Sequence, residues 1–436
     1  MQTNPQGPGS LQLSGDRPKE HLADDRLGYA DFARSIARSI AGLASTEGIV
    51  LAVNGPWGTG KTTVVNMIVE ALALQEPEQG RKVVPVRFNP WWFSEQESLV
   101  KAFFAELSAS LEKKVSDKVG EGFRNIARRV ASSKELLVTG LGLVPGAAAA
   151  KELAGAALGT LGALVGNDRS LSDLRDDLSK ALREQDKRVL VIIDDVDRLP
   201  PDEVRQIFRL VKSVADLPNV IHLLIFDRAI AERAFVEPAH DLGPKWHEKI
   251  IQAAFDLPPV QRADIQRMFL DDLNKLVGTR SLDDPMRWAN VFHDSIAPWL
   301  ATPRDARRLL NSLVVSWPAV ARDVDLADFV ALETFRLFEP RLHAFIRNNP
   351  QSLTGLPRSL DKASRTKVAE NILATAEPGG QQRAQVALSR LFPKLQSAWS
   401  SFGFGSPACR SGIARGASAL PDDFLPISDS KLVTTR

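Results

Sequence analysis

The chain has 436 residues, enough for two or three domains, and its 44% hydrophobic and 25% charged residues are ordinary for a globular protein. A formal net charge of +2 gives no global reason to expect nucleic acid or a membrane surface as a partner. The single cysteine, Cys409, excludes a disulfide within the chain and fits a reducing compartment such as the cytoplasm.

The N-terminal segment 1–20 is polar and rich in Gly, Pro and Gln, which predicts a disordered segment without a secretory signal. Apolar side chains at helical spacing then predict a helix over 29–43. A short apolar run at 48–54 predicts a buried strand, and helical periodicity resumes over 62–74. A predicted strand and a predicted helix are therefore separated by a short loop.

That loop and the first residue of the helix read Gly-Pro-Trp-Gly-Thr-Gly-Lys-Thr, the complete phosphate-loop pattern G-x-x-x-x-G-K-[ST]. Its glycines let backbone N–H groups turn around a phosphate, Lys61 brings a cation to the β- and γ-phosphates, and Thr62 offers its hydroxyl to Mg²⁺. The helix N-terminus that follows also favours an anion. The nucleotide-binding residues predicted here are Gly55, Pro56, Trp57, Gly58, Thr59, Gly60, Lys61, Thr62 and Thr63.

A second strand is predicted at 83–88, followed by an amphipathic helix over 98–115. The basic continuation of this helix carries Arg124, Arg128 and Arg129. Basic runs can bind nucleic acid, but they usually lie on solvated helix faces. The sequence therefore gives direct nucleic-acid binding little support.

Residues 136–166 are unusually rich in Ala, Gly and Leu. A membrane-spanning helix needs about 20 apolar residues, and each half of this segment has roughly fifteen. Three interpretations stay open: a self-packed helical hairpin, a re-entrant or interfacial membrane segment, and a membrane hairpin.

A continuous apolar run at 189–193 predicts a strand buried in a parallel sheet, and it ends in Asp194 and Asp195. Because parallel strands present their carboxyl ends at one edge, these acids and the phosphate loop should share that edge. Asp194 is the natural partner for Mg²⁺, and Asp195 can polarise the attacking water. Asp197 and Arg198 follow, either as a local ion pair or as part of the site.

Another buried strand is predicted at 220–226, and it ends in Asp227. That carboxylate can sense the γ-phosphate, cap the next helix, or do both. Strands that alternate with helices predict a doubly wound α/β fold. The other predicted helices cover 171–182, 204–214, 265–276, 286–296, 303–317 and 325–346.

The predicted helix 303–317 opens with three arginines, Arg304, Arg307 and Arg308. An arginine can stabilise the charge that builds up on a transferring phosphoryl group. The alternative is a solvated basic face. Periodicity is lost beyond 399, which predicts a flexible or truncated tail.

In this order, the segments resemble the KAP family of phosphate-loop NTPases over roughly residues 20–315. The resemblance implies a three-layer parallel sheet at 21–258 with a helical insertion at about 110–185. The pattern of the residues themselves then predicts a helical region at 259–398 and a flexible or truncated tail at 399–436. It also implies that Gly28 lies near the nucleotide base. The segments that carry it are 24–32, 55–62, 88–91, 189–199, 226–227, 248–252, 257–258 and 302–313.

The resemblance implies Mg²⁺-dependent hydrolysis of ATP, with Lys61, Asp195 and Asp227 as catalytic residues. Arg304 or Arg308 would complete the site, in cis or from a neighbouring subunit. Hydrolysis would then drive a conformational switch. The alternatives are a regulatory or scaffold module that binds nucleotide with little turnover, and a phosphate-loop kinase, although no acceptor-site signature is present.

Many KAP members carry transmembrane helices in the insertion, which here contains 136–166. We expect a cytoplasmic protein. The alternative is a protein that associates with a membrane through 136–166. The chain carries no recognisable ankyrin repeats, so the resemblance favours the bacterial type linked to phage exclusion. The partners implied are ATP, further copies of the chain, and proteins of a defence operon.

Overall fold

A five-stranded, all-parallel sheet with the strand order β2-β3-β4-β1-β5 organises the N-terminal part of the chain. The three inner strands are almost wholly buried, as their continuous apolar runs predict. Asn54 at the end of β1 pairs in register with Phe226 of β4 and with Asp256 of β5. The strands are β1 (Ile49–Asn54), β2 (Lys82–Phe88), β3 (Lys187–Ile193), β4 (Val220–Phe226) and β5 (Ala253–Asp256).

The computed structural model describes residues 13, 15, 17–75, 81–94, 99–132, 170–236, 249–278, 284–350, 353, 362–393, 395 and 399. The chain divides into two compact units. The sheet unit is Pro18–Pro259, and the helical unit is made of Met1–Arg17 and Val260–Arg436. Each unit has its own packing.

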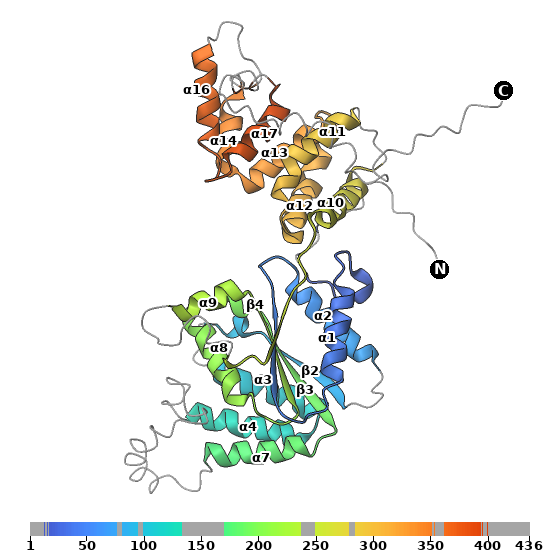
Figure 1. Cartoon of the computed structure of the whole chain (residues 1–436), viewed down its shortest axis with the longest axis vertical. Coiled ribbons are helices and arrows are strands. Elements are labelled where there is room, and N and C mark those ends of the chain that lie inside the picture. The colour runs from blue at the N-terminus through green and yellow to red at the C-terminus, as the bar shows by residue number, and fades with distance from the viewer. Residues whose placement is uncertain are drawn as a thin grey trace, which may run out of the picture. The chain divides into compact units, whose positions relative to one another are not determined.

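Helices cover both faces of the sheet, so the predicted three-layer α/β fold is confirmed. Figure 1 shows α1 and α2 on one face and α3, α8 and α9 on the other. On the outside, α4 packs on α3 and α7 packs on α4. The helices are α1 (Ala30–Ala41), α2 (Lys61–Leu74), α3 (Leu99–Lys114), α4 (Asp117–Ser132), α7 (Leu171–Arg183), α8 (Pro201–Val214) and α9 (Arg228–Val236).

Buried aromatic rings fix the carboxyl ends of two strands. Phe88, the last residue of β2, packs edge-on against Phe103 of α3, with ring centroids 5.2 Å apart. Phe226, the last residue of β4, does the same with Phe208 of α8 at 5.4 Å. The polar residues that follow these strands therefore start from rigid positions.

Strand β5 is a four-residue edge strand that pairs only with β1. The next residue, Leu257, donates its backbone N–H to the Asn54 carbonyl at 2.7 Å. A Cβ atom on Gly55 would lie 3.1 Å from the Leu257 Cβ, a closer approach than most side chains make. The start of that loop and the exit from β5 are thus in direct contact.

In the described part of the helical unit, every regular element is a helix. The predicted helices at 265–276 and 303–317 are present as α10 and α12. Where a helix was predicted over 286–296, α11 runs into a short π-helix, η5. The elements are α10 (Arg262–Val277), α11 (Pro285–Val291), η5 (Phe292–Ile296), η6 (Ala297–Trp299), α12 (Pro303–Val320), α13 (Leu326–Phe338), α14 (Pro340–Asn348), α16 (Lys362–Leu373) and α17 (Gln381–Leu391).

The single helix predicted over 325–346 is wrong, because α13 and α14 are separated at Glu339. Pro340 has no N–H to donate, and its ring disfavours helical geometry in the residue before it. Glu339 accordingly has φ −134° and ψ 61°. Its side chain, only 1% exposed, accepts hydrogen bonds from Trp299 Nε1 at 3.0 Å and from Arg383 at 3.2 Å.

The Ala- and Gly-rich segment 136–166 lies outside the described residues. Among the helices that are described, none combines the length and the apolar character that crossing a bilayer requires.

Candidate functional site

The phosphate loop joins β1 to α2 and has the backbone that its glycines allow. Gly58 has φ 84° and Gly60 has φ 96°, both in the left-handed region that residues with a Cβ rarely adopt. The Thr59 hydroxyl donates to the Pro56 carbonyl at 2.7 Å, which closes the turn. Trp57 is 63% exposed at the tip of the loop.

Side chains from outside the loop hold it in place. The buried Tyr29 hydroxyl donates to the Thr59 carbonyl at 2.8 Å. Burial and the nearby Asp25 charge raise the pKa of Tyr29 well above its usual value, so the phenol stays a donor. Thr63 accepts from the Lys19 N–H at 3.1 Å.

Lys61, the lysine of the phosphate loop, is buried, and its ammonium group is hydrogen-bonded and ion-paired. Its Nζ lies 2.9 Å from the Gly55 carbonyl oxygen and 3.1 Å from Asp197 Oδ2. The Lys61 and Asp197 side chains are only 8% and 4% exposed. The lysine charge is thus balanced by a carboxylate from η3 (Val196–Arg198), the 3-10 turn that follows β3.

Asp194, directly after β3, lies against the first turn of α2. Its carboxylate accepts a hydrogen bond from the Thr62 hydroxyl. Burial, followed by the charge of neighbouring Asp195, raises the pKa of Asp194 above its usual value. A buried carboxylate beside a second acid and a hydroxyl is an environment that a divalent cation would stabilise, and oxygen atoms are the ligands that Mg²⁺ prefers.

Asp195 is oriented from two sides. Asn89, directly after β2, donates from Nδ2 to Asp195 Oδ2 at 2.9 Å, and Arg198 Nε lies 2.6 Å from Oδ1. The Asp195 backbone has φ 60°, an uncommon conformation for a residue with a side chain, of the kind that gathers at functional sites. The carboxylate is therefore held in one orientation.

Asp197 and Arg198 each form an ion pair with a charged residue of the candidate site. Asp197 contacts Lys61, and Arg198 contacts Asp195, so both side chains belong to the site. Sequence reasoning did not single out Asn89 or Tyr29 as residues that position the site. For Asn89 a signal existed, because it is a polar residue directly after a strand of the same sheet.

Asp227 and Gly28 lie in the same unit. Asp227 Oδ1 accepts from the Ala229 N–H at 3.0 Å, which is the helix-capping contact of α9. Its role at the γ-phosphate stays a prediction. Gly28 has φ 78° and directly precedes Tyr29, whose hydroxyl reaches the phosphate loop. Its proximity to a nucleotide base also stays a prediction.

The three candidate arginines lie on the first two turns of α12, in the helical unit. A reciprocal capping box between Thr302 and Asp305 begins the helix. The Arg308 guanidinium lies over the Phe338 ring, 5.4 Å from its centroid. The roles of Arg304 and Arg308 in the nucleotide site stay predictions.

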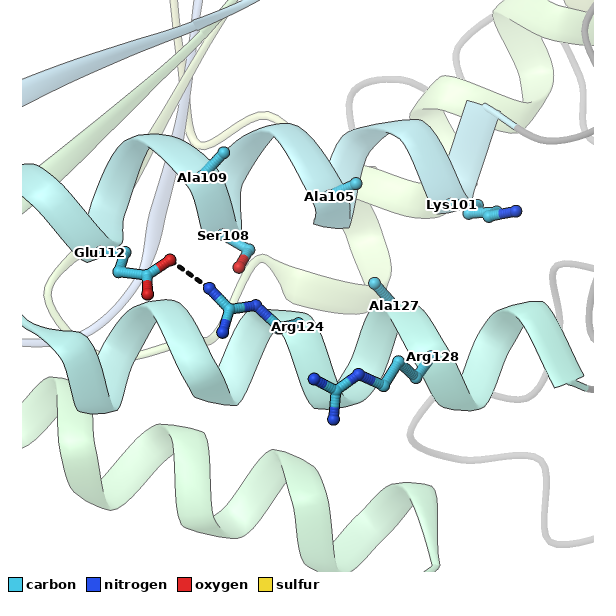
Figure 2. A pocket seen from close by; sticks show the side chains of 8 residues that line it. All are labelled: Lys101, Ala105, Ser108, Ala109, Glu112, Arg124, Ala127 and Arg128. Atoms are coloured by element: carbon cyan, nitrogen blue, oxygen red, sulfur yellow. Dashed lines mark hydrogen bonds and ion pairs between the residues drawn. The ribbon is translucent and has the colours of Figure 1, made fainter.

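The basic stretch around Arg124 lines a separate groove of about 320 Å³ between α3 and α4. Figure 2 shows Arg124 and Glu112 directed toward each other across this groove, where they form an ion pair. Three alanines contribute to its lining. Part of the basic charge is therefore neutralised within the fold. The residues that line the groove are Lys101, Ala105, Ser108, Ala109, Glu112, Arg124, Ala127 and Arg128.

The chain is 28% identical over 354 residues to the phage T7 exclusion protein of Escherichia coli (strain K12), across 75% of this chain and 46% of that protein. The chain therefore spans less than half the length of this relative.

Two solved structures are more distant. Cdc6p from Pyrobaculum aerophilum has a TM-score of 0.42 and 14% identity, over 89% of this chain and 88% of its own. The ORC2 protein of Aeropyrum pernix has a TM-score of 0.40 and 13% identity, over 93% and 88%.

A family model, that of the KAP family P-loop domain, matches residues 29–319. This match covers more than half of the chain. It includes the phosphate loop, the two acids after β3 and the start of α12, which the sequence analysis had singled out. The chain therefore belongs to the KAP family of P-loop NTPases.

Proposed function

We propose that the protein binds ATP together with Mg²⁺ and hydrolyses it, and that hydrolysis drives a conformational switch. The observation that carries this proposal is the orientation of Asp195 by Asn89 and Arg198. This carboxylate directly follows Asp194, which contacts Thr62 of the phosphate loop. Phosphoryl transfer depends mainly on positioning and on charge stabilisation, which such a set of side chains supplies.

Each side chain has a defined task in this proposal. The loop N–H groups and Lys61 bind the β- and γ-phosphates, while Thr62 and Asp194 hold Mg²⁺. The described residues contain no cluster of three His, Cys, Asp or Glu side chains suited to a metal. In the proposal, phosphate oxygens and water would complete the Mg²⁺ site. Asp195 accepts a hydrogen bond from the attacking water and orients it.

Arginine is the remaining part of the proposal. Arg304 and Arg308 lie one helical turn apart on α12, so they share a face of that helix. Either guanidinium would stabilise the charge on the transferring phosphoryl group. It would act in cis or from a neighbouring copy of the chain.

Release of phosphate from ATP without an added acceptor tests the hydrolase. We expect the Lys61→Ala variant to lose about 100-fold or more of the parent rate, because the β- and γ-phosphates lose their cation. Lys118→Ala, which removes an exposed lysine of α4, is the matched control and should keep the parent rate. A parent rate no higher than that of Lys61→Ala would refute hydrolysis. Phosphate release that requires an acceptor would indicate a kinase.

A second candidate is a regulatory module that binds nucleotide with little turnover. One observation favours it, since both Asp195 oxygens already have partners and Lys61 is already paired. Asp195→Asn distinguishes the two, because asparagine tolerates the left-handed backbone at this position. A hydrolase loses turnover and keeps ATP binding in this variant. In a binding module, the parent and the variant bind ATP equally and neither releases phosphate.

We further propose a role in defence against phage, supported by the similarity to the phage T7 exclusion protein. The partners in that role would be further copies of the chain or proteins encoded beside it. Plating efficiency of phage on cells that express the parent should fall relative to cells that express Lys61→Ala. Equal plating on both would refute the proposal.

A further inference from the structure

The turn η3 contacts both charged residues on which the proposed reaction depends. Asp197 pairs with Lys61 at 3.1 Å, and Arg198 pairs with Asp195 at 2.6 Å. One short turn thus supplies the counter-ion for the cation that binds phosphate and for the anion that orients water. Lys61 and Asp195 therefore each have a counter-ion without any ligand.

The position of η3 is fixed by the fold. Val196 is fully buried in the sheet core, and the Arg198 N–H donates to the Asp195 carbonyl at 3.1 Å. The Leu199 N–H donates to the Val196 carbonyl at 3.3 Å, which closes the turn. Asp197 is therefore presented to Lys61 by rigid backbone.

The ion pair and a bound phosphate would compete for the same charge. Lys61 Nζ donates to the Gly55 carbonyl at 2.9 Å as well as to Asp197, so its hydrogens are directed inside the loop. A phosphate in the loop needs this ammonium group. Because both partners of the pair are shielded from water, separating them has a large electrostatic cost.

We propose that Asp197 is a latch, a positioning residue that holds Lys61 in the ligand-free site and that the nucleotide phosphates must displace. The inference rests on the proposed nucleotide site. In this arrangement Asp197 sets the nucleotide affinity without contacting the nucleotide. It also keeps the ligand-free protein folded, because the buried lysine never lacks a counter-ion.

Calorimetric titration with Mg-ATP and thermal melting of the ligand-free protein test the latch, and neither depends on turnover. Asp197→Asn keeps the side-chain shape and removes the competing charge. We expect it to bind ATP about tenfold more tightly than the parent and to melt at a lower temperature without ligand. Asp197→Glu restores the charge and should return ATP affinity toward the parent value.

Two controls separate the latch from a general effect of removing a charged partner. Arg124→Gln breaks the ion pair with Glu112 in the separate groove between α3 and α4, and its ATP affinity should stay within about twofold of the parent because Lys61 is untouched. In a Lys61→Ala background, Asp197→Asn should no longer strengthen binding. If Asp197→Asn raises ATP affinity in the parent but not in the Lys61→Ala variant, Asp197 acts on ATP binding through Lys61.

The outcomes separate this inference from the function on which it rests. If the parent binds ATP and Asp197→Asn binds it equally or more weakly, the latch is overturned and the nucleotide site stands. If the parent and all the variants fail to bind ATP, the proposed function is overturned and the latch with it. A gain in affinity that persists in the Lys61→Ala background also overturns the latch.

Discussion

One of the two partners that orient Asp195 is an amide side chain, that of Asn89. Asn89 donates to Asp195 at 2.9 Å and accepts from the Trp91 N–H at 3.0 Å. Trp91 belongs to η2 (Pro90–Phe93), and Phe93 of the same turn stacks on Phe88. Asn89 is therefore fixed by the turn that follows it, and Asp195 is fixed by Asn89.

Asn89→Ala removes the hydrogen bond and leaves both charged partners of the site in place. We expect turnover to fall about tenfold while ATP affinity stays within about twofold, because the water-orienting group alone is disturbed. Steady-state hydrolysis and calorimetric binding measure the two effects. Asn125→Ala, on α4, is the matched control. Unchanged turnover in Asn89→Ala would show that Asp195 needs no such support.

His222 gives the fold a defined sensitivity to acid. It lies in the middle of β4, fully buried, and neither ring nitrogen has a hydrogen-bond partner among the described residues. Burial lowers the pKa of His222 to about 4, from 6.5. Between pH 6.5 and about 4, His222 is therefore protonated in the unfolded chain but stays neutral in the folded protein.

The sign of the effect follows from linkage. Above pH 6.5 the imidazole is neutral in both states, and its full contribution to stability is present. As the pH falls from 6.5 to about 4, the unfolded chain gains the proton first, and about 3 kcal/mol of unfolding free energy is lost. His222→Leu should remove this loss, measured by urea unfolding at pH 7 and pH 5.

At the scale of elements, periodicity predicted the core strands and most of the helices. It succeeded at β3 and β4 because a fully buried strand admits only apolar residues. It failed at Glu339 because the helical pattern of apolar residues continues through a residue whose backbone Pro340 restrains.

The partners within the site could be predicted only in part. The motifs placed Lys61, Asp194 and Asp195 at one edge of the sheet. They did not predict that Lys61 pairs with Asp197, which lies 136 positions away in the chain, or that Asn89 reaches Asp195 across 106 positions. Such contacts depend on the path of the turns after β2 and β3, and no spacing rule encodes that path.

Glu339 joins separate elements of the helical unit. It accepts from Trp299 of η6 and from Arg383 of α17, and the Arg383 guanidinium also lies 4.6 Å from the Trp299 ring centroid. Glu339→Ala removes the acceptor of these two donors and of the Glu377 N–H, and should lower the unfolding free energy by about 3 kcal/mol. Denaturant unfolding measures this loss. Glu370→Ala, at an exposed position, should change stability by less than about 0.5 kcal/mol.

At the scale of the whole molecule, the division into two compact units leads us to expect two unfolding transitions, of which ATP stabilises one. Lys61, Asp194 and Asp195 all lie in the sheet unit, so ATP should stabilise that unit directly. In calorimetry, ATP at 100 times its dissociation constant should stabilise one transition by about 2.7 kcal/mol. Glu339→Ala should lower the melting temperature of the other transition, that of the helical unit. One transition that responds to both would show that the units unfold together.

The edge strand β5 has a mechanical consequence for the proposed switch. Leu257 contacts the start of the phosphate loop through Gly55 and through its hydrogen bond to Asn54. The C-terminal stretch of the helical unit begins at Val260, three residues later, a span of at most about 11 Å of extended chain. In the proposed switch, a displacement of the loop backbone at Leu257 would therefore be separated from Val260 by three peptide units, which leave little slack.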